Sequence, residues 1–139
     1  KRYTSIEIAD ELCLKRILNA RRRGMGIWEI DTFWIPFPVQ EGKNTRPYYP
    51  KIFLILDAVT GLILCHEAME NIRKEGHFCI KAIIQLINDD LAPARIIVER
   101  DETYYLLRKA CRQLKITLEK VAYLKLMPKF RKKILSGEL

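Results

Sequence analysis

Asp31 is the residue of this sequence whose type and position most need a chemical explanation. It stands in the apolar stretch WEIDTFWIPFPV, residues 28–39, which has the character of a β-strand. Side chains alternate along a strand, so Glu29 and Asp31 would share one face. Aspartate is depleted in strands, and a buried carboxylate is costly unless a partner, a metal ion or water satisfies it. We therefore expect Asp31 to be either a metal ligand or a hydrogen-bond acceptor of Arg46, Thr32 or a neighbouring backbone group.

Basic residues form two blocks that could contact phosphate groups. The chain has a formal net charge of +8 and a pI of about 9.4, which is compatible with a nucleic-acid partner. The candidates for nucleic-acid contacts are Arg21, Arg22, Arg23, Lys129, Arg131, Lys132 and Lys133. A solvated surface explains the same charges, so both interpretations stay open.

The cysteines indicate the compartment in which the protein works. Cys13, Cys65, Cys79 and Cys111 form no CxxC pair and lie in apolar stretches, where a free thiol behaves as a small hydrophobic residue. This usage is typical of a reducing cytoplasm. No apolar run is long enough to span a membrane, so we expect a cytoplasmic protein without a membrane partner. The chain begins at Lys1, as a piece of a larger parent chain would.

Hydrophobic periodicity predicts the elements that must position these residues. A helix is expected over residues 4–20, with Thr4 and Glu7 as a capping box. A hairpin should form where the turn DAVTG follows one apolar strand and precedes another. The predicted strands are residues 27–37, 52–56, 62–68, 94–99 and 115–121, and the later helices are residues 75–88, a helix starting near residue 101, and residues 128–135.

This order of elements predicts an α/β domain with a mixed sheet. The hairpin is antiparallel, and the later strand–helix–strand crossover should be parallel and right-handed. We expect two parts: an N-terminal helical extension over residues 1–26 and one domain over residues 27–139. The extension should either pack on the domain or join a partner chain, which leaves a homodimer open.

The order of elements resembles the ribonuclease H-like fold of integrase and transposase catalytic cores. WEIDTFWIP is similar to the first strand of these cores, where a W-x-x-D pattern carries an acid. FLILDAVTGLIL is similar to their second and third strands, and RIIVERDETYYLLRKACRQLKI to the fourth strand and the helix after it. The resemblance covers residues 27–135. It implies a five-stranded mixed sheet, β-β-β-α-β-α-β-α, with the first strand at its centre.

The resemblance also implies a chemistry. In these cores clustered carboxylates hold two divalent metal ions, Mg²⁺ or Mn²⁺, which activate water or a hydroxyl to attack a phosphodiester. The implied first catalytic acid is Asp31 and the second is Glu99 or Asp101, with Asp31 and Asp101 as metal ligands. A third acid is implied on the last helix, for which Glu138 is the candidate. The stretch ERDET stands where the family has D-N-G, so the acidic set is incomplete.

Three functions follow, and the sequence leaves open whether the chain is an enzyme. The favoured one is a ribonuclease H-like domain with an incomplete acidic site that binds DNA or RNA without strong catalysis. The second is a nuclease or DNA strand-transfer core that depends on Mg²⁺ or Mn²⁺. The third is a protein-interaction module of a larger bacterial protein.

Overall fold

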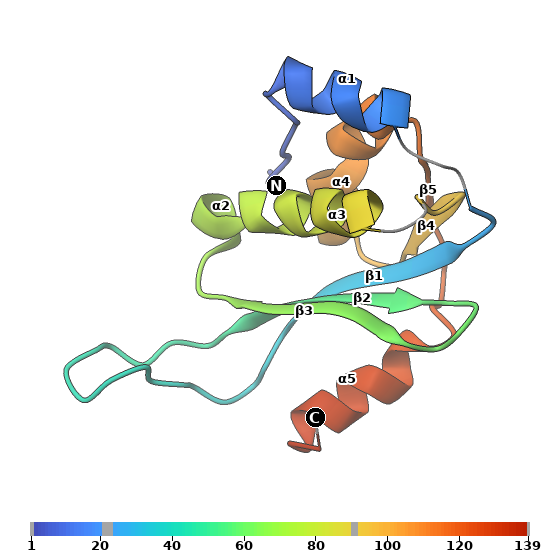
Figure 1. Ribbon diagram of the computed structural model, residues 1–139. Coiled ribbons are helices and arrows are strands. Elements are labelled where there is room, and N and C mark those ends of the chain that lie inside the picture. Colours follow the sequence, from blue (N-terminus) through green and yellow to red (C-terminus); the bar gives the residue numbers. More distant parts are fainter. Residues whose placement is uncertain (1, 21–23, 90–91, 139) are drawn as a thin grey trace.

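A five-stranded mixed sheet forms the centre of the computed structural model, which describes residues 2–20, 24–89 and 92–138 (Figure 1). Its strand order is β3-β2-β1-β4-β5. β1 pairs antiparallel with β2 and parallel with β4, so the predicted mixed sheet with a central first strand is confirmed. The strands are β1 (Ile27–Trp34), β2 (Lys51–Asp57), β3 (Ile63–Met69), β4 (Arg95–Val98) and β5 (Thr117–Lys120).

The turn between β2 and β3 forms as the sequence predicts. The Asp57 carboxylate accepts the backbone N–H groups of Val59 at 2.8 Å and Thr60 at 3.2 Å. Gly61 closes the turn with φ +76°, a left-handed conformation that glycine adopts without strain. Asp57 is therefore a turn residue that fixes the hairpin register.

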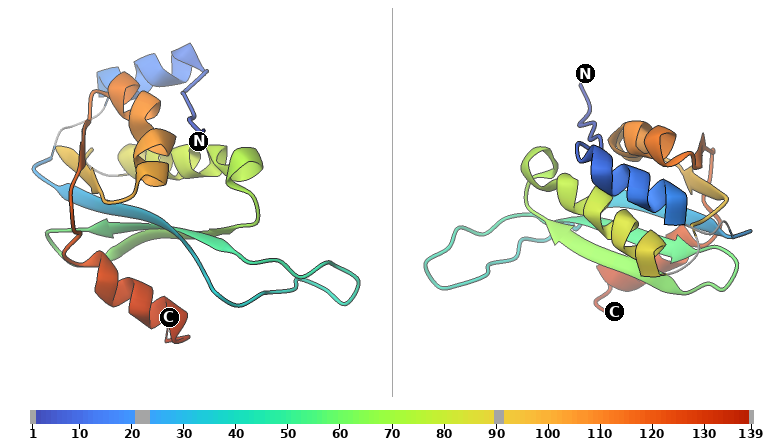
Figure 2. Two further views of the ribbon diagram at one scale, coloured as in Figure 1. Left: turned by 180° about the vertical axis from the view of Figure 1, so that it is seen from behind. Right: turned by 45° about the horizontal axis from the view of Figure 1, so that its top comes forward.

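Helices cover both faces of the sheet, and each face has its own core (Figures 1 and 2). On one side lie α1 (Glu11–Ala20), α2 (Ile72–Glu75), α3 (His77–Asp89) and α4 (Asp101–Leu114), and on the other lies α5 (Met127–Leu135). The larger core, under α3 and α4, includes Trp28, Ile30, Phe53, Ile55, Ile83 and Leu107. The smaller core, under α5, consists of Phe33, Ile52, Leu54, Leu56, Leu124 and Met127. Alternate residues of β1 thus feed opposite cores, as the strand pattern predicts.

The N-terminal helix starts later than predicted. α1 begins at Glu11, and Asp10 caps it by accepting the N–H of Cys13 at 3.0 Å. The predicted capping box of Thr4 and Glu7 is wrong, because residues 2–10 are not helical. Aspartate is a strong N-cap residue, and the preceding segment forms tertiary contacts instead.

Those contacts attach the N-terminal segment to α4. The N–H of Ile8 donates to the side chain of Gln113 at 2.7 Å, and the Gln113 amide donates back to the Ile8 carbonyl at 2.9 Å. Ile8 and Ile17 are buried in the larger core. The expected packing of this region on the domain is therefore confirmed for its described residues, whereas Arg21, Arg22 and Arg23 lie outside them.

Residues 35–50, called the arm below, connect β1 to β2. β1 ends at Trp34, earlier than the predicted residue 37, and the arm projects beyond the sheet (Figure 1). Val39 and Tyr48 form an antiparallel bridge across it. The side-chain amide of Gln40 donates to the carbonyls of Lys43 at 3.2 Å and Thr45 at 2.7 Å. The arm is therefore an internally bonded hairpin.

Candidate functional site: a buried carboxylate held by two arginines

Asp31 lies at the centre of β1 with its side chain fully buried on the face that α5 covers. Its Oδ2 accepts the Nε–H of Arg131 at 2.7 Å. Its Oδ1 accepts the Nε–H of Arg100 at 3.1 Å and the backbone N–H of Thr32 at 3.0 Å. The predicted Thr32 contact is confirmed through its backbone. The other residue considered as a partner, Arg46, is exposed on the arm, and the Asp31 contacts among the described residues are with Thr32, Arg100 and Arg131 instead.

The two arginines reach Asp31 from different elements. Arg100 is the N-cap residue of α4, and only Glu99 separates it from the end of β4, the strand that pairs parallel with β1. Arg131 comes from α5. The Arg100 side chain is 45% exposed, whereas that of Arg131 is 19% exposed. Arg131 is therefore the more buried of the two partners.

Arg131 also contacts Glu99, another of the predicted catalytic acids. Its Nη2 lies 3.4 Å from Oε1 of Glu99, which also accepts the backbone N–H of Leu124 at 3.0 Å. One guanidinium thus bridges two of the carboxylates that the resemblance implies as catalytic acids. We call Asp31, Glu99, Arg100 and Arg131 the carboxylate–guanidinium cluster.

Burial and ion pairing act on Asp31 in opposite directions. Burial raises the pKa of the Asp31 carboxyl, because desolvation penalises its charged form, and this effect outweighs the lowering by Arg100 and Arg131. The cluster contains two carboxylates and two guanidiniums, so its charges balance when both acids are ionised. Arginine suits such a site because its planar group stays protonated and donates along fixed directions.

Asp101 does not join this cluster by any contact of the described residues. Its carboxylate pairs with Lys120 of β5, and its side chain is 50% exposed. Glu138 is exposed beyond the end of α5. Among the described residues, no group of three or more histidines, cysteines, aspartates or glutamates is arranged to hold a metal ion.

The donor set consequently does not fit the implied two-metal site. Both carboxylate oxygens of Asp31 already accept charged donors, and the second acid, Glu99, shares one of them. The assignment of Asp31, Glu99 and Asp101 as catalytic residues stays a prediction, as does that of Asp31 and Asp101 as metal ligands.

Glu29, two residues before Asp31, is a second buried acid on the same face. It is 2% exposed, and its carboxylate accepts the N–H groups of Leu126 at 3.1 Å and Met127 at 2.9 Å. These donors belong to the start of α5, where free N–H groups and the helix dipole favour an anion. Alternation along the strand predicts Glu29 on the face of Asp31, but no role for Glu29 was predicted from the sequence.

A second polar cluster lies on the opposite face of β1 and was missed from the sequence. Lys51 Nζ lies 2.5 Å from Glu102 Oε1, and the Thr32 hydroxyl donates to the same oxygen at 3.2 Å. The Thr32 hydroxyl also lies 2.9 Å from that of Thr103. The signal for this cluster was Lys51 itself, a lysine at the start of the apolar stretch KIFLILD.

The basic residues predicted to contact nucleic acid differ in exposure. Lys129 and Lys132 are exposed on α5, and Lys133 is partly exposed with its Nζ 5.7 Å from the ring of Phe130. These three lysines are spaced i, i+3 and i+4 and therefore lie on one side of the helix. Arg131 points inward to Asp31 instead. The assignment of all these residues to nucleic-acid contacts stays a prediction.

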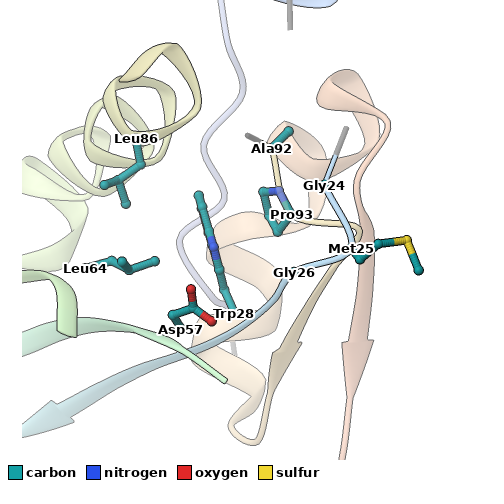
Figure 3. A pocket seen from close by; sticks show the side chains of 9 residues that line it. All are labelled: Gly24, Met25, Gly26, Trp28, Asp57, Leu64, Leu86, Ala92 and Pro93. Atoms are coloured by element: carbon teal, nitrogen blue, oxygen red, sulfur yellow. The ribbon is translucent and has the colours of Figure 1, made fainter. Parts of the chain in front are cut away.

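A separate cavity of about 180 Å³ lies at the beginning of β1 (Figure 3). Trp28, Leu64, Leu86 and Pro93 line it with apolar surface. Asp57 is the ionisable residue among its lining side chains, and its carboxylate is engaged by the turn. This cavity therefore offers little polar chemistry.

The half-buried Cys65 and the buried Cys79 and Cys111 are not activated nucleophiles. Burial raises the pKa of Cys65 to about 11 and the pKa values of Cys79 and Cys111 to about 12. A thiol must ionise to attack or to bind a metal, so these three remain neutral at physiological pH. They fill the core, as expected from their apolar surroundings.

Solved structures identify the fold class. The chain matches the magnesium-bound HTLV-2 integrase catalytic core domain in its trimeric form with a TM-score of 0.56 and 14% identity, over 84% of this chain and 70% of that one. The dimeric form matches with a TM-score of 0.54, the same identity and the same coverage. An intasome of simian T-cell lymphotropic virus in complex with PP2A regulatory subunit B56 gamma matches with a TM-score of 0.56 and 17% identity. This match covers 84% of this chain and 41% of that one. The chain therefore has the ribonuclease H-like fold.

The family follows from the sequence. Residues 13–135 match a domain of unknown function, DUF6930, and the chain belongs to this family. No curated protein matches it. Among the described residues, no helix combines the length and apolarity needed to cross a membrane.

Proposed function

We propose that this chain is a ribonuclease H-like domain that binds nucleic acid and does not cleave it by two-metal chemistry. The observation that carries the proposal is the position of Arg131, which bridges Asp31 and Glu99 at 2.7 Å and 3.4 Å. The resemblance to integrase cores implies that α5, the last helix, supplies a third acid. In this chain the same helix supplies an arginine to the first two.

A buried carboxylate such as Asp31 needs a cation that neutralises its charge. In a two-metal site the divalent ions perform this role and remain open to substrate. A guanidinium also neutralises the charge, but it neither polarises a bound water nor leaves the carboxylate oxygens free. A metal ion would bind Asp31 only by displacing two charge-assisted hydrogen bonds, which are among the stronger contacts in proteins. We therefore infer that the cluster stabilises the fold.

Binding to nucleic acid is supported by the charge of the chain and by α5. The formal net charge is +8, and α5 presents Lys129, Lys132 and Lys133 on one side. Lysines arranged in this way can each neutralise a phosphate and release counterions. Nothing among these contacts reads base edges, so we expect binding with little sequence preference.

Salt-dependent binding tests the first half of the proposal. We would measure fluorescence anisotropy of a labelled short strand and a labelled duplex of equal length, from low to physiological salt. K129A/K132A should lower the slope of log K against log[salt] by about 1–2. The control K81A/K109A removes two exposed lysines from the other side of the sheet and should leave the slope unchanged. Absence of binding at low salt would favour a protein-interaction module.

A metal titration tests the second half. Millimolar Mg²⁺ or Mn²⁺ should leave the melting temperature unchanged and should produce no cleavage of labelled DNA or RNA. A ligand that binds only the folded state raises that temperature, so a metal ion held by Asp31 would be detected. A gain that disappears in D31N would overturn the proposal and support the metal-dependent nuclease.

A further inference from the structure

Two large aromatic side chains are exposed at the two ends of the arm. One is at the last residue of β1, before the arm, and the other is close to the start of β2. Trp34 is 55% exposed and Tyr49 is 56% exposed. Aromatic residues of this size carry much apolar area, and an exposed pair with basic neighbours indicates a contact surface.

Two hollows in the surface meet at Trp34. The first, of about 280 Å³, is lined by Tyr3, Thr32, Phe33, Trp34, Lys51, Arg100, Asp101 and Glu102. The second, of about 620 Å³, is lined by Trp34, Arg46, Pro47, Tyr48, Tyr49, Glu70, Asn71, Lys74 and Glu75. Trp34 lines both hollows, so they adjoin at this residue, and we call the two hollows together the track. The track runs from Arg100 to the base of the arm.

The indole of Trp34 is held in place from inside the protein. Lys51 Nζ lies 4.2 Å from the centre of the ring, a cation–π contact, and Glu102 fixes that ammonium group at 2.5 Å. The Lys51 side chain is only 5% exposed. One side of Trp34 therefore covers the buried ammonium group of Lys51, and the contact holds the exposed part of the ring in one orientation. A fixed ring loses little conformational entropy when a ligand stacks on it.

Exposed basic side chains of the track can contact an anionic chain. Arg46 and Lys74 are exposed in one hollow. In the other, the Arg100 side chain donates its Nε–H to Asp31 and is still 45% exposed.

Most of the acids that line the track are already engaged. Asp101 pairs with Lys120, and Glu102 pairs with Lys51. Glu75 accepts the backbone N–H groups of Glu70 and Asn71 at 2.7 and 2.8 Å. Glu70 is exposed at the margin beside Lys74.

We propose that this track binds unpaired nucleotides of a single-stranded nucleic acid, with a base stacked on Trp34 and phosphates on Arg100 and Arg46. This inference rests on the proposed function, because it names the form of nucleic acid that the domain takes. Stacking requires an open base face, which a duplex does not offer, and it tolerates every base. Tyr49, in the arm, provides a second stacking position.

Three probes of equal length separate stacking from charge: oligothymidylate, an abasic oligomer with the same phosphates, and a duplex. Oligothymidylate should bind most tightly at physiological salt. W34L keeps an apolar cover over Lys51 but removes the stacking ring, and it should weaken oligothymidylate binding by about 5-fold or more. W34F should restore much of the affinity. R46Q should weaken the oligothymidylate and abasic probes alike.

The matched control is Y123L, because Tyr123 is 84% exposed and lies outside the track. Its affinity for oligothymidylate should equal that of the unchanged chain. If W34L lowers the melting temperature strongly, the test uses W34F and the abasic comparison on folded protein. Equal affinity for oligothymidylate and the abasic oligomer would overturn the stacking site while leaving nucleic-acid binding intact. No binding of either probe at low salt would overturn the proposed function itself.

Tryptophan emission gives an independent readout. The chain has two tryptophans, and Trp28 is only 5% exposed. Oligothymidylate should therefore quench mainly Trp34, and the quenching should disappear in W34F. Unchanged quenching in W34F would contradict a base stacked on this ring.

Discussion

Glu29 and Asp31 are two buried acids on one face of one strand, and they are satisfied in different ways. Glu29 accepts backbone N–H groups of Leu126 and Met127. Asp31 accepts one backbone N–H group and two arginine side chains, Arg100 and Arg131. Both acids attach α5 to the central strand, one at the beginning of the helix and the other one turn further on. The difference lies in the donors, since a backbone donor is always present and a side-chain donor depends on the sequence.

This difference decides which of the two acids could lose its contacts by a single substitution. Glu29 accepts backbone N–H groups at the start of α5, so a change of side chain in that helix does not remove its donors. The Asp31 contact would lose its main donor by a change of one residue, Arg131, and the carboxylate would then need another cation. Asp31 is the acid that the sequence predicts to be functional. It is also the acid whose main contact can be removed by substituting one side chain, that of Arg131.

The largest expected effect is that of R131M. Methionine keeps an apolar side chain of similar length but removes the guanidinium, which leaves Asp31 with Arg100 alone. Breaking a buried ion pair from one side typically costs 3–5 kcal/mol. We expect about 2–3 kcal/mol here, because Arg100 remains and Asp31 can take up a proton. Urea denaturation gives the value.

K132M is the matched control for R131M, since Lys132 is the exposed neighbour on the same helix. It should change the free energy of unfolding by less than about 0.5 kcal/mol. Mg²⁺ should raise the melting temperature of R131M more than that of the unchanged chain, because a cation can then approach Asp31. An R131M protein as stable as K132M would mean that the guanidinium contributes nothing to the fold.

The next effect is that of E29Q. The amide of glutamine can still accept hydrogen bonds through one oxygen, but it loses the charge that the start of α5 favours. We expect a loss of about 1–2 kcal/mol, measured by urea denaturation. E7Q, at an exposed residue of the N-terminal segment, should leave the stability unchanged. If E29Q leaves the free energy of unfolding unchanged, Glu29 does not contribute to holding α5 on the sheet.

Local signals in the sequence were sufficient for the sheet. The strand–helix order and the DAVTG turn were predicted because they depend on periodicity and turn chemistry, and the central position of β1 was predicted from the resemblance to ribonuclease H-like cores. The buried face of Asp31 also follows from alternation along β1. The start of α1 was wrong because the Thr4–Glu7 box competed with Asp10, and pairing of Ile8 with Gln113 is not visible in local sequence.

The partners of Asp31 could not be predicted for a related reason. Arg100 and Arg131 lie 69 and 100 residues along the chain from Asp31, and 25 lysines and arginines compete for such a role. The inward position of Arg131 depends on the rotation of α5 about its own axis against the sheet. The amphipathic pattern of the helix specifies this rotation only approximately. Lys51 was missed because its burial requires Glu102 on another element.

A smaller effect is expected at Arg100. Its side chain is 45% exposed, so water screens its interaction with Asp31 and can replace it. R100Q should destabilise the protein by less than about 1 kcal/mol, clearly less than R131M, as measured by urea denaturation. An R100Q loss equal to that of R131M would show that the two guanidiniums share the role equally.

The finest test of the comparison is the pH dependence of D31N. Burial raises the folded-state pKa of Asp31 above its ordinary value. Below the unfolded pKa the carboxyl is protonated in both states, and its contribution to stability is fully present. As pH rises through the folded pKa, that contribution is lost, because the folded state must hold a buried charge that water would solvate better. D31N carries no such charge, so the stability of the unchanged chain minus that of D31N should fall from acidic pH towards neutrality and then level off. Urea denaturation of both proteins across this range gives the difference.

A difference that instead grows with pH would show that Arg100 and Arg131 together outweigh burial and hold the pKa of Asp31 below its ordinary value. Asp31 would then be an ion-pair anchor stabilised by its charge.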